Sequence, residues 1–305
     1  MMAGRALDGA KLRGALEKAL GFRFLAFERL KCVNSINFKA VRDPDGYAFT
    51  VKCMPPARRL GYEWIVRHLD ELKGTLAPQR VFERDCPAQY GGYDLVCLSW
   101  CEGESLFPDR LTDGELIGFL DDYLEFSAAL QHTTLHHRPY PAEQWRDEAL
   151  ARCKGGWGWL VRPVVEECKA EESAFRPGLM RIQHGDLHPG NFVFSEGRVT
   201  GFLDIEGLTE GYPAWDLVRY FTFSLDHLRP FEFRRKEAIL RHFAKTVRHM
   251  PYTRLEWIVS LNVSWLEQVH KKLERPRIGL GAALQLRQHA RLYRRLRAIV
   301  RDILV

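Results

Sequence analysis

The residues best suited to chemistry in this 305-residue chain lie in one short stretch, His184 to Asn191. Asp186 supplies a carboxylate, and Asn191, five residues later, supplies a carboxamide. Asp204 follows the apolar run 201–203 as a second carboxylate, at a point where a short strand would end. Hard carboxylate and amide oxygens suit Mg²⁺, which neutralises the charge spread over the oxygens of a transferred phosphoryl group. The order of these groups therefore indicates phosphoryl transfer.

Three blocks of sequence resemble the aminoglycoside phosphotransferase and choline kinase superfamily, which shares the two-lobed protein-kinase-like fold. The blocks are His184 to Asn191, Asp204 to Gly207, and Gly211 to Leu217, the last being similar to that family's G-x-P-x-x-D-L signature. In the family the Asp of this signature, here Asp216, braces the catalytic loop from the start of a helix. One such block alone is a weak signal, but the order and spacing of all three are specific.

The resemblance implies a role for each of these residues. Asp186 is expected to orient the acceptor hydroxyl and to accept its proton, a contribution of about 10²–10⁴-fold to the rate. Asn191 and Asp204 are expected to hold magnesium, with Asp204 bridging the metal to the β- and γ-phosphates of ATP. Glu206 would project to the same side as Asp204 if the segment is extended, and could then contact a second metal or the substrate.

Lys52 is the residue expected to contact the ATP phosphates, as a strand lysine does in the kinase-like fold. Thr50 lies two residues earlier on the same face of the predicted strand and would line the adenine pocket. Glu63, on the helix that follows, is favoured as the partner of Lys52, and Glu71 is the rival. The plainer alternatives are an ordinary strand lysine and a solvated helix glutamate.

Two further segments are candidates for binding the nucleotide. The loop Val33 to Phe38 should cover the phosphates but has no glycine, so Ser35 is expected to donate to phosphate, with a structural hairpin turn as the alternative. Trp100, Cys101 and Glu102 resemble the family's strand-to-hinge segment, in which backbone groups read adenine. Trp100 could equally be a core residue.

The predicted fold class is α+β, a two-lobed protein-kinase-like fold with residues 1–100 as the nucleotide-binding lobe and residues 101–305 as the catalytic, mainly helical lobe. The first lobe should hold a five-stranded antiparallel sheet, with strands at 24–33, 37–42, 47–54, 81–84 and 94–100. A helix is expected over 58–73. The second lobe should contain helices at 113–131, 144–161, 215–228, 232–250, 254–274 and 280–304.

Composition limits the class of protein. The chain is 46% hydrophobic and 28% charged, and it has no run of about 18 apolar residues, so no membrane-spanning helix is expected. The N-terminus lacks an apolar signal core, which argues against export. The seven cysteines are odd in number and include no C-x-x-C pair. We therefore expect free thiols in a reducing cytoplasm rather than zinc or a disulfide framework.

The net charge of +6 is unevenly distributed along the chain. Ten Lys or Arg residues and two acidic residues follow residue 270, a net +8, so residues 1–270 sum to −2. In the last helix Arg291 and Arg294 lie on a different face from Leu292 and Leu296. A solvated face is the simplest interpretation, and an anionic substrate, a membrane surface or nucleic acid are the alternatives. No basic motif with interleaved aromatics appears, so nucleic acid is not expected as a partner.

The spacing of two aspartates narrows the substrate. Eleven residues separate Asp204 from Asp216, which leaves no room for a long activation segment that could dock a folded protein. A small molecule with a free hydroxyl is therefore expected, such as an amino alcohol, an aminoglycoside or a sugar. Its site could be lined by Tyr252, Trp257, Trp265 and Glu267, with the aromatics as a cation–π site for an ammonium. The helical spacing of Trp257, Leu261 and Trp265, however, favours core packing first.

These observations together predict an ATP- and Mg²⁺-dependent phosphotransferase. A catalytically inactive, nucleotide-binding pseudokinase is the alternative, supported by the glycine-free loop. A third possibility is a scaffold that the basic C-terminal helix recruits to a membrane or to nucleic acid, which would bind in a salt-dependent manner and ignore ATP.

Overall fold

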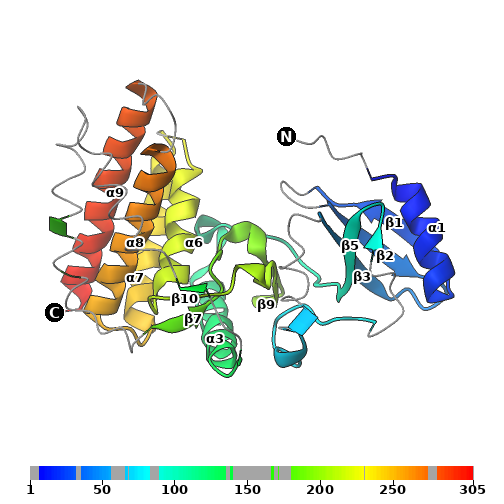
Figure 1. The fold of residues 1–305 in the computed structure, drawn as a ribbon. Helices are drawn as coiled ribbons and strands as arrows, with labels where there is room; N and C mark the ends of the chain where they lie inside the picture. The colour runs from blue at the N-terminus through cyan, green and yellow to red at the C-terminus, as the bar shows by residue number, and fades with distance from the viewer. Residues whose placement is uncertain are drawn as a thin grey trace. The chain divides into compact units, whose positions relative to one another are not determined.

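The computed structural model describes residues 7–31, 36–55, 66–67, 69–82, 89–134, 138–139, 166–167, 171, 180–229, 231–273 and 280–304. The chain divides into two compact units, shown with all elements in Figure 1. Unit 1 comprises Met1–Gly103 and Thr200–Glu206, and unit 2 comprises Glu104–Val199 and Gly207–Val305. The predicted α+β class is confirmed, with the five-stranded antiparallel sheet in unit 1 and most of the helices in unit 2.

The sheet of unit 1 has the strand order β1-β2-β3-β5-β4. Its strands are β1 (Phe24–Arg29), β2 (Ile36–Arg42), β3 (Ala48–Met54), β4 (Gln89–Tyr90) and β5 (Tyr93–Ser99). Helix α1 (Gly9–Leu20) begins at Asp8, whose carboxylate accepts hydrogen bonds from two backbone amides of the first turn. Leu12 and Leu16 of α1 are fully buried and join the core formed by the apolar side chains of the sheet.

Residues 81–82 of the strand predicted at 81–84 do not form a strand, residues 83–84 lie outside the described part of the chain, and the fifth place in the sheet is taken by β4. Gly91 and Gly92 both have positive φ, +59° and +85°, and form a two-residue turn that joins β4 to β5. Residues 79–81 instead form an irregular edge beside β5, where Val81 donates a backbone hydrogen bond to Cys97. A glycine pair between two tyrosines was the hairpin signal in the sequence.

Unit 2 is built around helices that lie side by side in Figure 1. They are α3 (Asp113–Leu130), α6 (Trp215–Asp226), α7 (Phe233–His249), α8 (Arg254–Leu273) and α9 (Leu280–Ile303). Each agrees with its predicted range to within a few residues at either end. The predicted helix at 144–161 and the residues Ser35 and Glu63 lie outside the described residues, while 66–67 and 69–71 of the helix predicted at 58–73 are helical.

Unit 2 also contains short strands and turns, some of which continue into residues 200–206 of unit 1. Strands β6 (Arg138–Pro139), β10 (Thr209–Gly211) and β7 (Arg181–Gln183) form one small sheet in that order, and β8 (Phe192–Ser195) pairs with β9 (Arg198–Phe202). Single 3₁₀ turns occur at Pro189–Asn191 and Ile205–Gly207. None of the helices in the described ranges is both long and apolar enough to span a bilayer.

Candidate active site

Lys52 lies in β3, a central strand of the sheet of unit 1, opposite Asn37 of β2 and Val96 of β5. Alternation along β3 points Val51 and Cys53 into the core shared with α1, so Lys52 projects from the other face. Thr50 lies on the same face as Lys52, as the two-residue spacing predicts. The lysine is 6% exposed, so its ammonium must be satisfied by nearby polar groups.

Asp204 supplies a carboxylate to that ammonium. The Lys52 Nζ atom lies 2.6 Å from Asp204 Oδ1, within unit 1, and the Asp204 side chain is half exposed. Asp204 has φ of +54°, in the left-handed region that costs a non-glycine residue about 1 kcal/mol or more. Such strain persists where surrounding contacts impose it, and here Thr200 donates to the Glu102 carbonyl and Phe202 donates to the Leu76 carbonyl.

Close packing against Gly201 positions the segment predicted to read adenine. A Cβ atom at residue 201 would lie 2.3 Å from the Cys101 Sγ atom, so glycine is required there. Burial raises the pKa of the Cys101 thiol to about 11, which keeps it protonated near neutral pH. Trp100, at the end of β5, is partly buried, and the Lys39 ammonium lies 4.1 Å from its ring centroid.

The loop of unit 2 that carries Asp186 is held through its backbone by a buried aspartate. Asp216, in the first turn of α6, accepts hydrogen bonds from the backbone amides of His184 at 2.6 Å and Gly185 at 2.9 Å. Burial raises the pKa of Asp216, while His184 and the two amide donors oppose that shift. Asp216 is completely buried, so it acts inside the protein as a brace and not as a surface ligand.

Gly185 allows two backbone segments to approach each other at the active loop. Its φ is +80°, and a Cβ atom there would lie 1.8 Å from the Gly207 carbonyl oxygen. No other residue type could occupy this position without moving the loop. The next residue, Asp186, is thereby turned out of the loop with its side chain 43% exposed.

The guanidinium group of Arg219 binds the Asp186 carboxylate. Arg219 Nη2 lies 2.5 Å from Asp186 Oδ1, while Arg219 Nη1 donates to both oxygens of Glu267 at 2.7 and 2.8 Å. Glu267 is 4% exposed, and the Arg219 side chain packs 5.6 Å from the Trp215 ring centroid. Asp186 is thus part of a three-residue ionic network contributed by the loop, α6 and α8.

The remaining loop residues shape the surroundings of Asp186. Asn191 donates through its Nδ2 atom to the Asp186 carbonyl at 2.8 Å, which orients the carboxamide with Oδ1 as the atom available to a cation. The His188 ring stacks on Phe223 at 4.5 Å between centroids, and its Nε2 atom lies 3.9 Å from Asp186 Oδ2. Arg219 therefore contacts one oxygen of the Asp186 carboxylate and the His188 ring lies near the other, while the side chain as a whole stays partly exposed.

Comparison with known protein families adds evidence that covers most of the chain. A family model described as the phosphotransferase enzyme family matches residues 37–251. The chain belongs to this family. Family membership supports an ATP-dependent phosphotransferase, whereas no curated protein sequence matches the chain.

Solved structures similar to this phosphotransferase share its fold at low identity. An aminoglycoside phosphotransferase from Alicyclobacillus acidocaldarius has a TM-score of 0.62 at 15% identity, over 94% of each chain. A choline/ethanolamine kinase family protein from Mesorhizobium loti has a TM-score of 0.61 at 14% identity, over 96% of this chain and 99% of that one. An aminoglycoside phosphotransferase in a ternary complex with ADP and hygromycin B has a TM-score of 0.55 at 17% identity, over 95% and 98%.

The structure of the phosphotransferase bears on the expectations for Glu206 and Trp257. Residues 205–207 form a 3₁₀ turn, so the extended geometry on which the role of Glu206 depended is not present. Trp257 is fully buried and packs on Phe243 at 5.6 Å, which makes it a core residue. Among the described residues no cluster of three or more His, Cys, Asp or Glu side chains could hold a metal.

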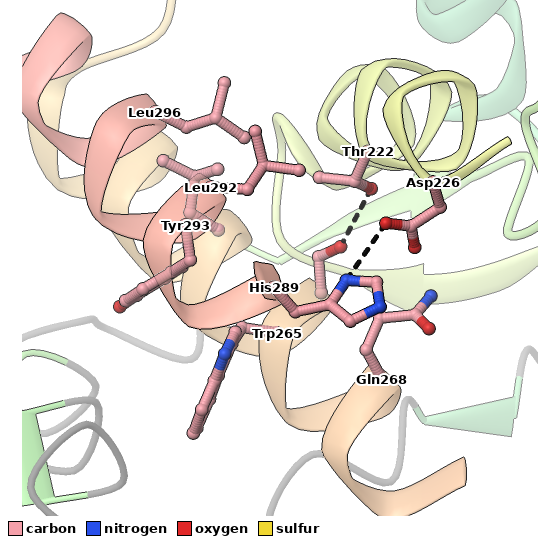
Figure 2. A pocket seen from close by; sticks show the side chains of 10 residues that line it. Thr222, Asp226, Trp265, Gln268, His289, Leu292, Tyr293 and Leu296 are labelled. Atoms are coloured by element: carbon pink, nitrogen blue, oxygen red, sulfur yellow. Dashed lines mark hydrogen bonds and ion pairs between the residues drawn. The ribbon is translucent and has the colours of Figure 1, made fainter. Parts of the chain in front are cut away.

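Trp265 lines a small pocket among α6, α8 and α9, shown in Figure 2. Its volume of about 20 Å³ has room for one water molecule. The His289 Nδ1 and Asp226 Oδ1 atoms lie 2.9 Å apart at the pocket, and the Thr222 and Ser264 hydroxyls are 3.2 Å apart. The pocket is therefore a small, mainly apolar gap between helices, bordered by these polar pairs and too small for a metabolite.

The sequence did not reveal the pairing of Arg219 with Glu267. A signal was present, since Glu267 is an acid that directly follows the largely apolar run from Trp257 to Leu266 and needs a cation when buried. Arg219 lies one helical turn after Asp216, on the helix that braces the loop. Helical spacing alone does not show which helix brings the partner, because α8 is 48 residues away in sequence.

Proposed function

We propose that this protein is an ATP- and Mg²⁺-dependent kinase that phosphorylates a hydroxyl group of a small molecule. The observation that carries the proposal is the ionic network of Asp186, Arg219 and Glu267, in which Arg219 holds one oxygen of a half-exposed carboxylate while the other oxygen lies 3.9 Å from the His188 Nε2 atom. A general base requires such an arrangement, because the carboxylate must be oriented and also reachable.

In the proposed reaction the acceptor hydroxyl donates a hydrogen bond to Asp186 Oδ2. The hydroxyl oxygen forms a bond to the γ-phosphorus of ATP, the bond from that phosphorus to the β–γ bridging oxygen breaks, and the hydroxyl proton passes to Asp186. The products are ADP and a phosphate monoester. Arg219 keeps its contact with Oδ1 throughout, so the base does not rotate away from the acceptor.

Lys52 and Asp204 are the residues proposed to bind the nucleotide and its metal ion. We propose that the Lys52 ammonium leaves its contact with Asp204 in part to bind a phosphate of ATP, while Asp204 and Asn191 hold Mg²⁺. Asp204 offers a half-exposed carboxylate, and Asn191 offers a carboxamide whose Nδ2 atom donates to the Asp186 carbonyl; each is an oxygen donor of the kind that a hard cation prefers. When bound, the metal would neutralise the phosphate charge that develops during transfer.

The short path from Asp204 to Asp216 supports a small acceptor. This path is occupied by the 3₁₀ turn at 205–207 and by β10, and it contains no platform for a peptide. Structural relatives contain ADP with hygromycin B or with spectinomycin, which are small molecules. An amino alcohol, an aminoglycoside or a sugar therefore fits the proposed reaction.

The deciding experiment is ADP release from Mg·ATP across a panel of choline, ethanolamine, aminoglycosides, homoserine, sugars and nucleosides. Asp186→Asn should abolish any substrate-dependent release, and Asp121→Asn, which removes the same charge from an exposed position, should not. Tight Mg·ATP binding without turnover of any acceptor would favour the pseudokinase. Failure to bind Mg·ATP at all would reject the proposal.

A further inference from the structure

Two neighbouring phenylalanines protrude from the start of α7. Phe231 is 66% exposed and Phe233 is 71% exposed, the highest values among the large hydrophobic side chains described. A single exposed hydrophobic residue is ordinary. Two exposed phenylalanines this close in sequence place a large apolar area in water, which is unfavourable and adds nothing to the core. Such a pair needs a partner that covers it.

The exposed side of α7 is lined with arginine. Arg234, Arg241 and Arg248 are spaced by seven residues, so they form one stripe along the helix. All three are exposed, and none forms an ion pair with another described residue. Their charge is therefore directed at solvent or at an external partner.

Helix α9 adds a second stripe to the same surface. Arg287, Arg291 and Arg294 are exposed and follow helical spacing, and α9 packs directly on α7. The Arg295 Nη2 atom lies 2.7 Å from Glu237 Oε1, and Glu237 lies between Arg234 and Arg241 on α7. This ion pair joins the two stripes into one surface. We call it the basic face, comprising Arg234, Arg241, Arg248, Arg287, Arg291 and Arg294.

The aromatic pair lies at one end of the basic face. Phe233 is four residues before Glu237, so it projects from the same side of α7 as the Glu237–Arg295 ion pair. Residues 229–249 and 287–304 together contain thirteen Lys or Arg and three Asp or Glu. The combination is strongly cationic and ends in two exposed aromatic rings.

We propose that the basic face docks on an anionic lipid bilayer, with its arginines against the headgroups and with Phe231 and Phe233 inserted at the interface. A solvated face explains the arginines but not the two rings. A nucleic-acid site would place aromatics among the cations, where bases could stack on them, and here they lie at one end. A bilayer satisfies both features, because anionic headgroups attract arginine and the interface accepts aromatic side chains. The inference does not depend on the proposed kinase activity.

The test is sedimentation of the full-length protein with vesicles of phosphatidylcholine alone or mixed with phosphatidylglycerol, at low and at physiological salt. Binding is expected to the anionic vesicles and to weaken with salt. The double variant F231S/F233S should lower the partition coefficient about tenfold. R234E/R241E should lower it by at least about tenfold at low salt.

Matched controls lie on unit 1. Leu25→Ser removes a hydrophobic side chain that is 58% exposed, and K11E/K18E makes the same change of charge on α1. Both should bind like the unaltered protein, and thermal unfolding should show that all four variants are folded. Three results would overturn the proposal: no binding to anionic vesicles at low salt, binding unchanged by F231S/F233S, or displacement of the vesicles by an oligonucleotide that binds more tightly.

Discussion

Each unit of the protein sets a cation with little exposure to solvent against a half-exposed aspartate, and the two contacts are built differently. In unit 1 the cation is the Lys52 ammonium on a flexible stem, facing Asp204. In unit 2 it is the planar Arg219 guanidinium, whose second edge is clamped by the buried Glu267. A point charge can move to another anion, whereas a fork with both edges engaged keeps its geometry. The first contact is suited to exchange with a phosphate, and the second to holding a base still.

The largest expected effect comes from a substitution of Asp186, the residue that Arg219 holds in place. Asp186→Asn keeps the shape of the side chain but removes the proton acceptor, so turnover of the identified acceptor should fall about 10³-fold. The affinity for Mg·ATP, measured by calorimetry, should change little. If the affinity for Mg·ATP fell together with the rate of turnover, Asp186 would contribute to nucleotide binding as well as to the acceptor.

The rigidity of the loop that carries Asp186 can be broken through Gly185. Gly185→Ala introduces a Cβ atom 1.8 Å from the Gly207 carbonyl oxygen at a positive φ, so the free energy of unfolding should fall by about 3 kcal/mol. Gly114→Ala is the matched control, because the new Cβ in α3 meets no atom within 4 Å and should stabilise the helix by about 0.5–1 kcal/mol. Urea unfolding of both variants measures the difference. Equal stabilities would mean that the loop is not held as tightly as its backbone suggests.

The exchangeable contact in unit 1 is tested by Lys52→Met. Removing the ammonium should lower kcat/KM for ATP about 10²-fold, since a positioned phosphate contact is lost. Stability without nucleotide should change by less than about 1 kcal/mol, because the desolvation of a buried ammonium offsets most of its attraction to Asp204. Lys39→Met, on β2 beside Trp100, provides a control that should retain activity. A large loss of stability in Lys52→Met would instead make Lys52 a structural residue.

A smaller effect is expected from a substitution of Arg219 that keeps its positive charge but changes the geometry of its side chain. Arg219→Lys keeps the positive charge but cannot engage Asp186 and Glu267 at once, so kcat should fall about tenfold while the KM for ATP stays constant. Arg235→Lys alters another forked arginine of unit 2, which bridges Asp109 and Glu232, and should leave kcat unchanged. Steady-state kinetics of the two variants with one acceptor give the comparison. An unchanged kcat in Arg219→Lys would show that charge alone supports the base.

Local sequence signals accounted for much of the fold. Alternating apolar residues predicted the strands around Lys52, and helical periodicity predicted α3, α6, α7, α8 and α9. The misplaced fifth strand shows the limit of such signals, because residues 79–81 form irregular hydrogen bonds at the edge of β5 while a two-glycine turn brings β4 into the sheet. Edge pairing depends on the neighbouring strand, which a local pattern does not specify.

The sequence by itself determined which chemical groups the protein has and in which order, from Asp186 through Asn191 to Asp204. Asp186 and Asn191 were found because a short spacing within one loop encodes local geometry directly, and Asp204 was found because it follows a short apolar strand. Tertiary structure decided which charges meet: Arg219 joins Asp186 to Glu267 across 48 residues, and Asp204 lies against Lys52 across 152. Packing of helix on helix and of segment on sheet brings these charges together, and their attraction acts only once that packing excludes water from around them.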